Sequence, residues 1–322
     1  MSVFSTVARH LFCPERTSSS TIRRVLFSTT MLDPPSFSRT FPEHLPNTFQ
    51  ALTLTQSKTC ATDHKILRFQ LPTNVPNVSS LNVPTGIKIR QLISGQVLDK
   101  SYSPISNIDA NGFMDVLVKQ YPFQQGGGLG KHLYDMKVGD VVDIKLKPTK
   151  LFKGTSYVPN RWQHLVLVGN GTGVAPMYQL AQHILHDPQE TTKITMISQH
   201  RSEVLMQQEL DAMSAAFPER FRHHSLLSQP VVNEGHKDDG HGVGVGRLGL
   251  KHLMDPTILN SMKESTNANN HCIVCGTDQF LESICGNIVR IDVGGKKLKK
   301  QQGPLLGLLK EAGWSKEQVT KL

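Results

Sequence analysis

Hydrophobic and polar positions follow two different spacings along the chain. From about residue 49 to residue 146, short segments alternate apolar and polar residues, and turn-rich stretches separate them. Alternation with a period of two predicts half-buried strands, and short strands joined by turns predict an antiparallel barrel or sandwich. The segments expected to be strands are 65–71, 86–93, 112–121 and 140–146, with one helix at 129–136.

After about residue 160, apolar runs alternate with segments that repeat apolar residues every three or four positions. Strands that alternate with helices predict a parallel sheet. We expect strands at 164–169, 193–198, 221–228 and 271–276, and helices at 175–185, 203–217 and 278–289. The predicted fold is an antiparallel β-barrel domain, residues 48–152, followed by a parallel α/β domain, residues 160–322.

Three other segments complete this prediction. Residues 229–246 are rich in Gly, His and Asp and should form a loop, and the basic run 294–300 should be a solvated loop. The C-terminal stretch predicts a short helix and then a capping box, in which Ser315 and Gln318 bond to each other's backbone.

Composition changes the picture mainly at the N-terminus. The 322 residues carry a formal net charge of +9, of which residues 1–30 hold +3, four arginines less Glu15. Residues 1–40 are rich in Arg, Ser and Thr and lack the apolar core of a secretory signal, so we interpret them as a targeting or disordered segment. Mitochondrial import is the first interpretation, a plastid the second, and a tail without an address the third.

The charge balance and the absence of certain motifs exclude some classes of ligand. The basic balance suits a nucleotide phosphate or an acidic protein partner. No basic stretch is interleaved with aromatics and no zinc-finger spacing occurs, so neither nucleic acid nor a metal is expected. No apolar run reaches the ~20 residues of a membrane span, although peripheral membrane contact is left open.

The five cysteines do not form a disulfide pattern, because their number is odd and their spacing scattered. Cys272 and Cys275 lie three apart on an expected strand, where they face opposite sides. Cys272 should therefore be packing, while Cys275 ends the strand at the edge where α/β sheets bind ligands.

Two glycine clusters each precede an expected helix. Gly169 and Gly171 match the start of a dinucleotide-binding turn, but Val174 stands where a third glycine belongs and no acid ends the next strand. Helix N-terminal N–H groups would still suit a pyrophosphate, and a glycine turn needed only for close packing is the alternative. The second cluster, 126–128, opens onto the helix at 129–136.

Two further motifs carry chemistry. The segment "KSYSPIS", residues 100–106, combines a cation, a ring and hydroxyls on one strand-to-turn segment. Tyr102 could lie on a planar ring system and Ser103 could bond its edge. The segment "CGTDQF" starts at Cys275.

In this order, the four motifs resemble the NADH–cytochrome b5 reductase branch of the ferredoxin–NADP reductase superfamily. The family pattern R-x-Y-[ST]-P-x-S is similar to "KSYSPIS", and G-G-x-[MLV]-S to "GGGLG". G-T-G-[IV]-[TA]-P is similar to "GTGVAP", and C-G-P-P-x-M to "CGTDQF". The resemblance covers residues 49–322.

This resemblance implies FAD in the barrel and NADH in the α/β domain. Hydride would pass from nicotinamide to flavin, and single electrons would pass on to an acceptor such as cytochrome b5, with Ser103 and Cys275 at the reacting rings. The implied FAD-binding residues are Lys100, Tyr102, Ser103, Pro104, Val116, Val118, Lys119, Gly126, Gly127, Leu129 and Gly130. The implied residues for the pyridine nucleotide, which Lys119 would also approach, are Gly171, Thr172, Gly173, Pro176, Cys275 and Gly276.

Departures from the family pattern leave alternatives open. Lys100 replaces an arginine and Gly130 a serine, which together would loosen FAD by one or two orders of magnitude. A relative that lost catalysis and kept a binding or assembly role is one alternative. A reductase for a quinone or an iron–sulfur protein is another. Gln199 and Glu203 favour NADH, whereas His200 and Arg201 would suit the 2′-phosphate of NADPH.

Overall fold

The structure is a computed structural model. It describes residues 48–73, 75, 86–107, 110–121, 128–147, 158–229, 243–254, 269–292 and 298–322. The chain divides into a unit Met1–Thr40 and a unit Phe41–Leu322, and the second contains every described residue. The expected targeting segment lies outside the described residues.

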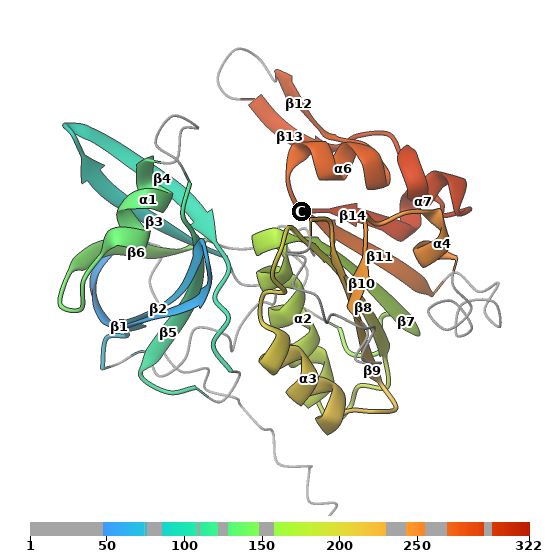
Figure 1. Cartoon of the computed structure of the whole chain (residues 1–322), viewed down its shortest axis with the longest axis horizontal. Coiled ribbons are helices and arrows are strands. Elements are labelled where there is room, and N and C mark those ends of the chain that lie inside the picture. Colours follow the sequence, from blue (N-terminus) through green and yellow to red (C-terminus); the bar gives the residue numbers. More distant parts are fainter. Residues whose placement is uncertain are drawn as a thin grey trace, which may run out of the picture. The chain divides into compact units, whose positions relative to one another are not determined.

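The first half of the second unit is an antiparallel sheet of six strands, as predicted (Figure 1). The strands are β1 (Gln50–Ala61), β2 (His64–Gln70), β3 (Gly86–Ile93), β4 (Gln96–Tyr102), β5 (Phe113–Lys119) and β6 (Val141–Lys147), in the order β4-β3-β6-β1-β2-β5. A bridge between Pro104 and Val116 joins the chain after β4 to β5, which lies at the other end of this order. The sheet is therefore drawn together into a barrel.

The strand β1 was not singled out from the sequence. Leu52 and Leu54 alternate with polar residues, but positions 55–60 are mostly polar, so the period-two signal fades after the first half. The strand continues because residues 54–61 pair with β2, with two register shifts, while residues 50–53 pair with β6. Tertiary pairing extends it beyond its own pattern.

The helix α1 (Gly128–Asp135) packs against the barrel core. Leu129 and Leu133 are fully buried. They contribute to a cluster of inward-facing residues from the strands, among them Leu67, Phe69 and Ile87. Full burial of such side chains stabilises the barrel by about 1.5–3 kcal/mol each.

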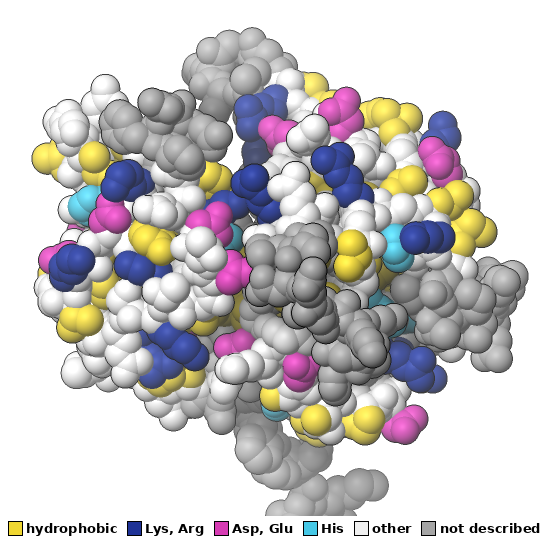
Figure 2. Space-filling model, viewed as in Figure 1, with side chains coloured by type: hydrophobic (Ala, Val, Ile, Leu, Met, Phe, Trp, Pro, Cys, Tyr) yellow, Lys and Arg dark blue, Asp and Glu magenta, His cyan; other side chains and the backbone are white. Residues whose placement is uncertain are grey.

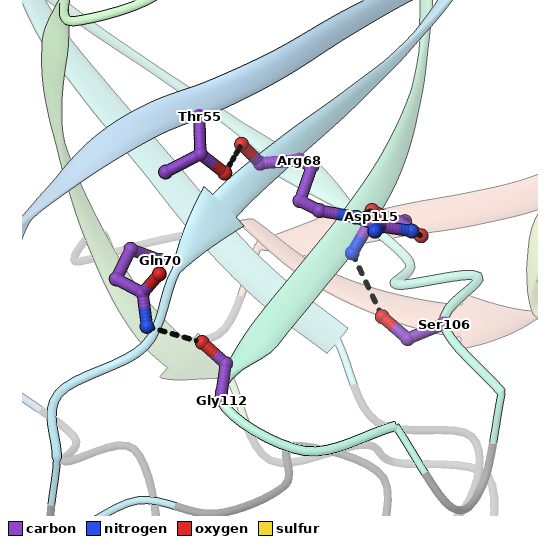
Figure 3. Close-up of polar contacts among 6 residues, drawn as sticks. All are labelled: Thr55, Arg68, Gln70, Ser106, Gly112 and Asp115. Carbon is purple, nitrogen blue, oxygen red and sulfur yellow. Dashed lines mark hydrogen bonds and ion pairs between the residues drawn. The ribbon is translucent and has the colours of Figure 1, made fainter.

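Polar contacts also tie β2 to β5 (Figure 3). Arg68 Nε and Nη2 donate to the two carboxylate oxygens of Asp115 at 2.7 and 2.8 Å. The Asp115 backbone N–H donates to Ser106 Oγ at 2.7 Å. Hydrogen bonding to Asp115 raises the pKa of Arg68. These contacts hold the segment that follows Tyr102 and Ser103 against the barrel.

The second half of the unit is a parallel sheet of six strands, also as predicted (Figure 1). The strands are β7 (His164–Asn170), β8 (Lys193–His200), β9 (Phe221–Leu227), β10 (Val243–Val245), β11 (Asn270–Cys275) and β14 (Val319–Lys321), in the order β10-β9-β8-β7-β11-β14. The helices are η2 (Gly171–Gly173), α2 (Val174–His186), α3 (Gln207–Ala216), α4 (Leu250–Leu253), α6 (Asp278–Cys285), α7 (Gly307–Glu311) and η3 (Lys316–Gln318).

Helices cover both faces of this sheet. The helices α2 and α3 pack with Leu165, Leu167 and other residues of the strands in one cluster. The helices α6 and α7 pack with Val166, Val168 and Cys272 in another. Both faces of β7 and β11 are therefore buried, which explains their near-continuous apolar sequences. The packing role predicted for Cys272 is confirmed.

Two predictions were wrong in the C-terminal part. The helix expected at 278–289 ends at Cys285, because Gly286 has φ +81° and turns the chain into β12 (Ile288–Asp292). The basic run 294–300 is not wholly a loop, since β13 (Leu298–Gln302) pairs with β12. Lysines are common on exposed edge strands. Because they also make the segment strongly charged, the sequence pattern did not indicate a strand there.

Three smaller outcomes concern the segments between these elements. The expected loop 229–246 contains the short strand β10, which pairs with β9. The helix α3 starts at Gln207 rather than at Glu203. The capping box is confirmed, since the Ser315 backbone N–H donates to Gln318 Oε1 at 3.1 Å.

Candidate active site

One cavity of about 1120 Å³ brings residues of both sheets together. Ten of the predicted site residues line it, namely Lys100, Tyr102, Ser103, Lys119, Gly171, Thr172, Gly173, Pro176, Cys275 and Gly276. They come from the end of β4, the end of β5, the turn before α2, the first turn of α2 and the end of β11. Segments far apart in the sequence thus meet at one site.

The barrel wall of the cavity is built from side chains. Tyr102 is the last residue of β4, lines the cavity and packs against the barrel core. Burial raises its pKa, so the phenol stays neutral at physiological pH. Ser103 follows directly outside the strand. The Lys100 ammonium lies 5.6 Å from the centre of the Tyr121 ring.

Lys119 is held in place by two contacts at the end of β5. Its Nζ lies 3.5 Å from Asp63 Oδ2 and 5.6 Å from the centre of the Tyr121 ring. The Gln120 backbone N–H donates to the Asp63 carbonyl at 2.8 Å, which fixes the turn around this pair. The ammonium is therefore oriented before any ligand binds.

The α/β wall is built mainly from backbone. Gly171 has φ +54°, a left-handed conformation that glycine adopts without steric cost. A Cβ on Gly173 would overlap the carbonyl oxygen of Cys275, so the two loops touch only because this residue is glycine. No side chain caps the start of α2. The Val174 N–H donates to the Gly171 and Thr172 carbonyl oxygens, and Pro176 has no N–H, so the helix start offers an anion fewer donors than the sequence predicted.

Cys275 ends β11 on this wall. Burial raises the pKa of its thiol to about 11, although the nearby Lys300 ammonium opposes the rise. The thiol is therefore neutral at pH 7 and is a poor nucleophile. Thr277 caps the following helix by accepting a hydrogen bond from the Phe280 N–H at 3.3 Å. Asp278 follows Thr277 and lies exposed in the first turn.

Five predicted residues do not line the cavity. Val116, Val118 and Leu129 are fully buried in the barrel core, Pro104 is buried at the bridge to Val116, and Gly130 is buried in α1. Leu117, which the sequence prediction omitted, lines the cavity instead. Alternation along β5 points residues 117 and 119 one way and the two valines the other. Gly126 and Gly127 lie outside the described residues.

Gly130 has a packing role that the sequence did not reveal. A Cβ at this position would lie 3.1 Å from the Lys119 carbonyl oxygen and 3.2 Å from the Tyr121 ring. Both distances are tight, so the glycine lets α1 approach the end of β5. Glycine at position 130 therefore lacks the serine hydroxyl of the family pattern, but it lets α1 pack closer to the end of β5.

The end of β8 bears on the choice between NADH and NADPH. His200 is buried, bonds to Ser198 Oγ at 2.9 Å, and burial lowers its pKa to about 4. It is neutral at pH 7 and is not oriented for a phosphate. Arg201 Nε donates to Gln229 Oε1 at 2.9 Å, and Glu203 Oε2 accepts from the Thr62 N–H at 2.8 Å. Glu203 therefore links β8 to the barrel.

Comparisons with known proteins agree with the two halves of this site. The model of the oxidoreductase FAD-binding domain matches residues 51–151, and that of the oxidoreductase NAD-binding domain matches residues 167–286. NADH-cytochrome b5 reductase 2 of Neurospora crassa is 34% identical over 262 residues, which cover 80% of this chain and 68% of that protein. The chain belongs to the NADH–cytochrome b5 reductase family.

Other relatives support the same assignment. NADH-cytochrome b5 reductase 2 of Chaetomium globosum is 34% identical over 261 residues, covering 80% of this chain and 67% of that protein. The cytochrome b5 reductase domain of Ulva prolifera nitrate reductase superposes with a TM-score of 0.62 at 20% identity, over 87% of this chain and all of that one. A ferredoxin NADP⁺ reductase from Neisseria gonorrhoeae gives 0.55 at 14% identity, over 73% and 88%. The structural likenesses confirm the fold class.

The charge and shape of the cavity suit the dinucleotides of this family. Five lysines line it and, among the described residues, no Asp or Glu side chain does; the lysines are Lys100, Lys119, Lys147, Lys300 and Lys321. Lys and Arg side chains also gather around the hollow in the upper middle of the face in Figure 2. A cationic cavity with an aromatic wall and a glycine turn fits pyrophosphates and planar rings.

Proposed function

We propose that the protein is an FAD-dependent oxidoreductase that takes electrons from NADH and passes them singly to cytochrome b5. The observation that supports this most is the single cavity, in which Tyr102 and Ser103 share a space with Gly173 and Cys275. Bound FAD supplies the redox chemistry, since it takes a two-electron hydride from a nicotinamide and releases electrons singly. The relatives named above carry the same activity in their names.

The residues of the chain supply orientation rather than acid–base chemistry. Tyr102 offers a neutral ring for the isoalloxazine, and Ser103 offers a hydroxyl to the ring edge. Lys100 offers a cation to the FAD pyrophosphate. Gly171 and Gly173 let backbone N–H groups approach the pyridine dinucleotide. Holding two reactants in line contributes about 7–11 kcal/mol towards lowering the barrier.

Cys275 contacts the nicotinamide as a neutral group in this proposal. Its pKa of about 11 leaves less than a hundredth of the thiol ionised at pH 8. A neutral thiol packs against the nicotinamide ring and does not attack it as a nucleophile. Because Cys275 lies at the strand end beside Gly276, its side chain would limit how far the nicotinamide ring enters the cavity.

NADH is the proposed donor rather than NADPH. The 2′-phosphate of NADPH needs a free cation at the end of β8. His200 is neutral and buried there, and the Nε–H of Arg201 is directed to Gln229. This arrangement favours the unphosphorylated ribose.

Absorption spectroscopy of the purified protein tests the proposal. We expect a flavin spectrum that bleaches on anaerobic addition of NADH, bleaches more slowly with NADPH, and recovers when oxidised cytochrome b5 is added. Protein that stays colourless after incubation with FAD would show that the fold serves as a binding module instead. Bleaching without transfer to cytochrome b5 would point to a quinone or an iron–sulfur acceptor.

Import into mitochondria is a separate proposal that rests on residues 1–40. Four arginines stand there against one acid within the first 30 residues. A fusion of residues 1–40 to a fluorescent protein should co-localise with a mitochondrial marker. Replacement of the four arginines by glutamine should abolish this, and accumulation in plastids or throughout the cytosol would contradict it. Within the described residues, no helix has the length and apolarity needed to span a bilayer.

A further inference from the structure

The hairpin of β12 and β13 is a separate part of the cavity wall. Its strands pair with each other and with neither six-stranded sheet. It follows residue 286, where the match to the NAD-binding domain ends. Figure 1 shows it beside α6. Lys300, Gln301 and Gln302 of β13 nevertheless line the cavity together with Cys275.

The base of the hairpin is fixed by a buried lysine. Lys321 is 4% exposed, and its Nζ donates to the carbonyl oxygens of Pro304, Gly303 and Asn287 at 2.8, 3.3 and 3.4 Å. The Gln302 amide and the Lys321 backbone exchange two hydrogen bonds of 2.7 and 2.8 Å. These bonds attach the end of β13 to β14, so the hairpin does not move freely.

Lys300 is the cation that this anchoring presents to the cavity. Within the described part of the chain, its ammonium has no hydrogen bond and no ion pair, in contrast to Lys321. It lies close enough to Cys275 to oppose the effect of burial on the pKa of that thiol. The Cys275 loop in turn touches the glycine turn at Gly173. A positive charge therefore lines the same cavity as the Cys275 loop and the glycine turn.

We propose that Lys300 binds the pyrophosphate of the pyridine dinucleotide, and that Lys321 and Gln302 position the hairpin for this contact. The proposal rests on the proposed function and adds a binding residue to the same site. An ammonium in a cavity wall that also contains a glycine turn favours an anion, because hydrogen bonds to a charged group are about twice as strong as neutral ones. The same chemistry would hold the FAD pyrophosphate, but Lys300 belongs to the hairpin that directly follows the NAD-binding match and shares the cavity wall with Cys275, which favours the pyridine nucleotide.

The test is NAD⁺ binding to the FAD-loaded protein, measured by titration calorimetry. Lys300→Ala should raise the Kd for NAD⁺ about tenfold, and Lys300→Arg should restore most of the affinity. Arg290→Ala is the matched control. Arg290 pairs directly with Lys300 across the hairpin and is exposed, but it does not line the cavity, so its loss should change the Kd less than twofold.

Further measurements separate this proposal from its competitors. Equal Kd values for wild type and Lys300→Ala would overturn the role of Lys300 while leaving the proposed function intact. A weaker FAD affinity of the apoprotein, with NAD⁺ binding unchanged, would move Lys300 to the FAD phosphate and overturn the proposal. So would a rise confined to the KM for cytochrome b5, which would make the hairpin a docking surface. Wild-type holoprotein that binds no NAD⁺ would overturn both proposals.

Discussion

The barrel wall and the α/β wall of the cavity are built from different parts of their residues. The barrel wall uses side chains, with Tyr102 and three lysines on strand ends. The α/β wall uses backbone, and its glycine turn and Cys275 loop are in contact. A wall of side chains tolerates the exchange of one cation for another, whereas a wall of backbone has no space for an added carbon atom. The lysine at position 100 and the glycine at position 173 illustrate the two cases.

Gly173→Ala should have the largest effect. The new Cβ would overlap the Cys275 carbonyl oxygen, so the two loops must separate and the site for the pyridine nucleotide is distorted. Overpacking of 1–3 kcal/mol corresponds to a rise of about 10- to 100-fold in the Kd for NAD⁺. The flavin spectrum should remain.

Gly249→Ala is the control for this change. That glycine has extended backbone, and the nearest atoms lie 4.0 Å from its added Cβ, away from the cavity. Its Kd for NAD⁺ should equal that of the wild type. If Gly173→Ala binds NAD⁺ normally, the α/β wall is more compliant than its contacts indicate.

Restoring the family residues on the barrel wall should have a smaller effect, and the two positions should differ in sign. Lys100→Arg regains a planar fork for phosphate and should tighten FAD binding by about tenfold in the apoprotein, measured by quenching of flavin fluorescence. Gly130→Ser should not tighten it. Its Cβ would press on the Lys119 carbonyl and the Tyr121 ring at 3.1 and 3.2 Å. Tighter binding by both variants would contradict the packing role of Gly130.

Acid should affect the α/β half through His200, on the order of 1 kcal/mol. Burial, and then the nearby His64, lower its pKa from 6.5 to about 4. The folded state therefore prefers the neutral ring. The stabilisation is complete above pH 6.5 and is lost as the pH falls towards 4.

Thermal unfolding between pH 8 and pH 4.5 tests this prediction. His200→Gln keeps a donor for Ser198 and has no titrating ring, so its Tm should fall less steeply with acid than that of the wild type. His132→Gln, on α1 of the barrel, is the control and should follow the wild type. Parallel curves for all three proteins would mean that His200 does not contribute to the acid sensitivity.

The sequence predicted the elements with strong periodicity and failed where packing overrides local preference. β3 was predicted at its observed bounds, and α2 to within one residue at each end. Helix α6 was extended too far, because an apolar pattern continues past Gly286 and only the positive φ of that glycine ends the helix. At the site, the motifs identified loops that line the cavity. On β5, however, the prediction named Val116 and Val118, which face the barrel core, and omitted Leu117, which lines the cavity.

The order of the four motifs determined the fold class and the family, because each motif requires a particular strand, turn or helix start. The tertiary structure decided what local sequence does not encode. It placed Lys300 and Lys321 at the same cavity as Lys100, although they lie about 200 residues away in the chain. The hairpin outside both sheets is held there because Lys321 of β14 donates to carbonyl groups at its base. The tertiary structure also explained Gly130, because a close approach between a helix and a strand end exists only after the barrel has formed.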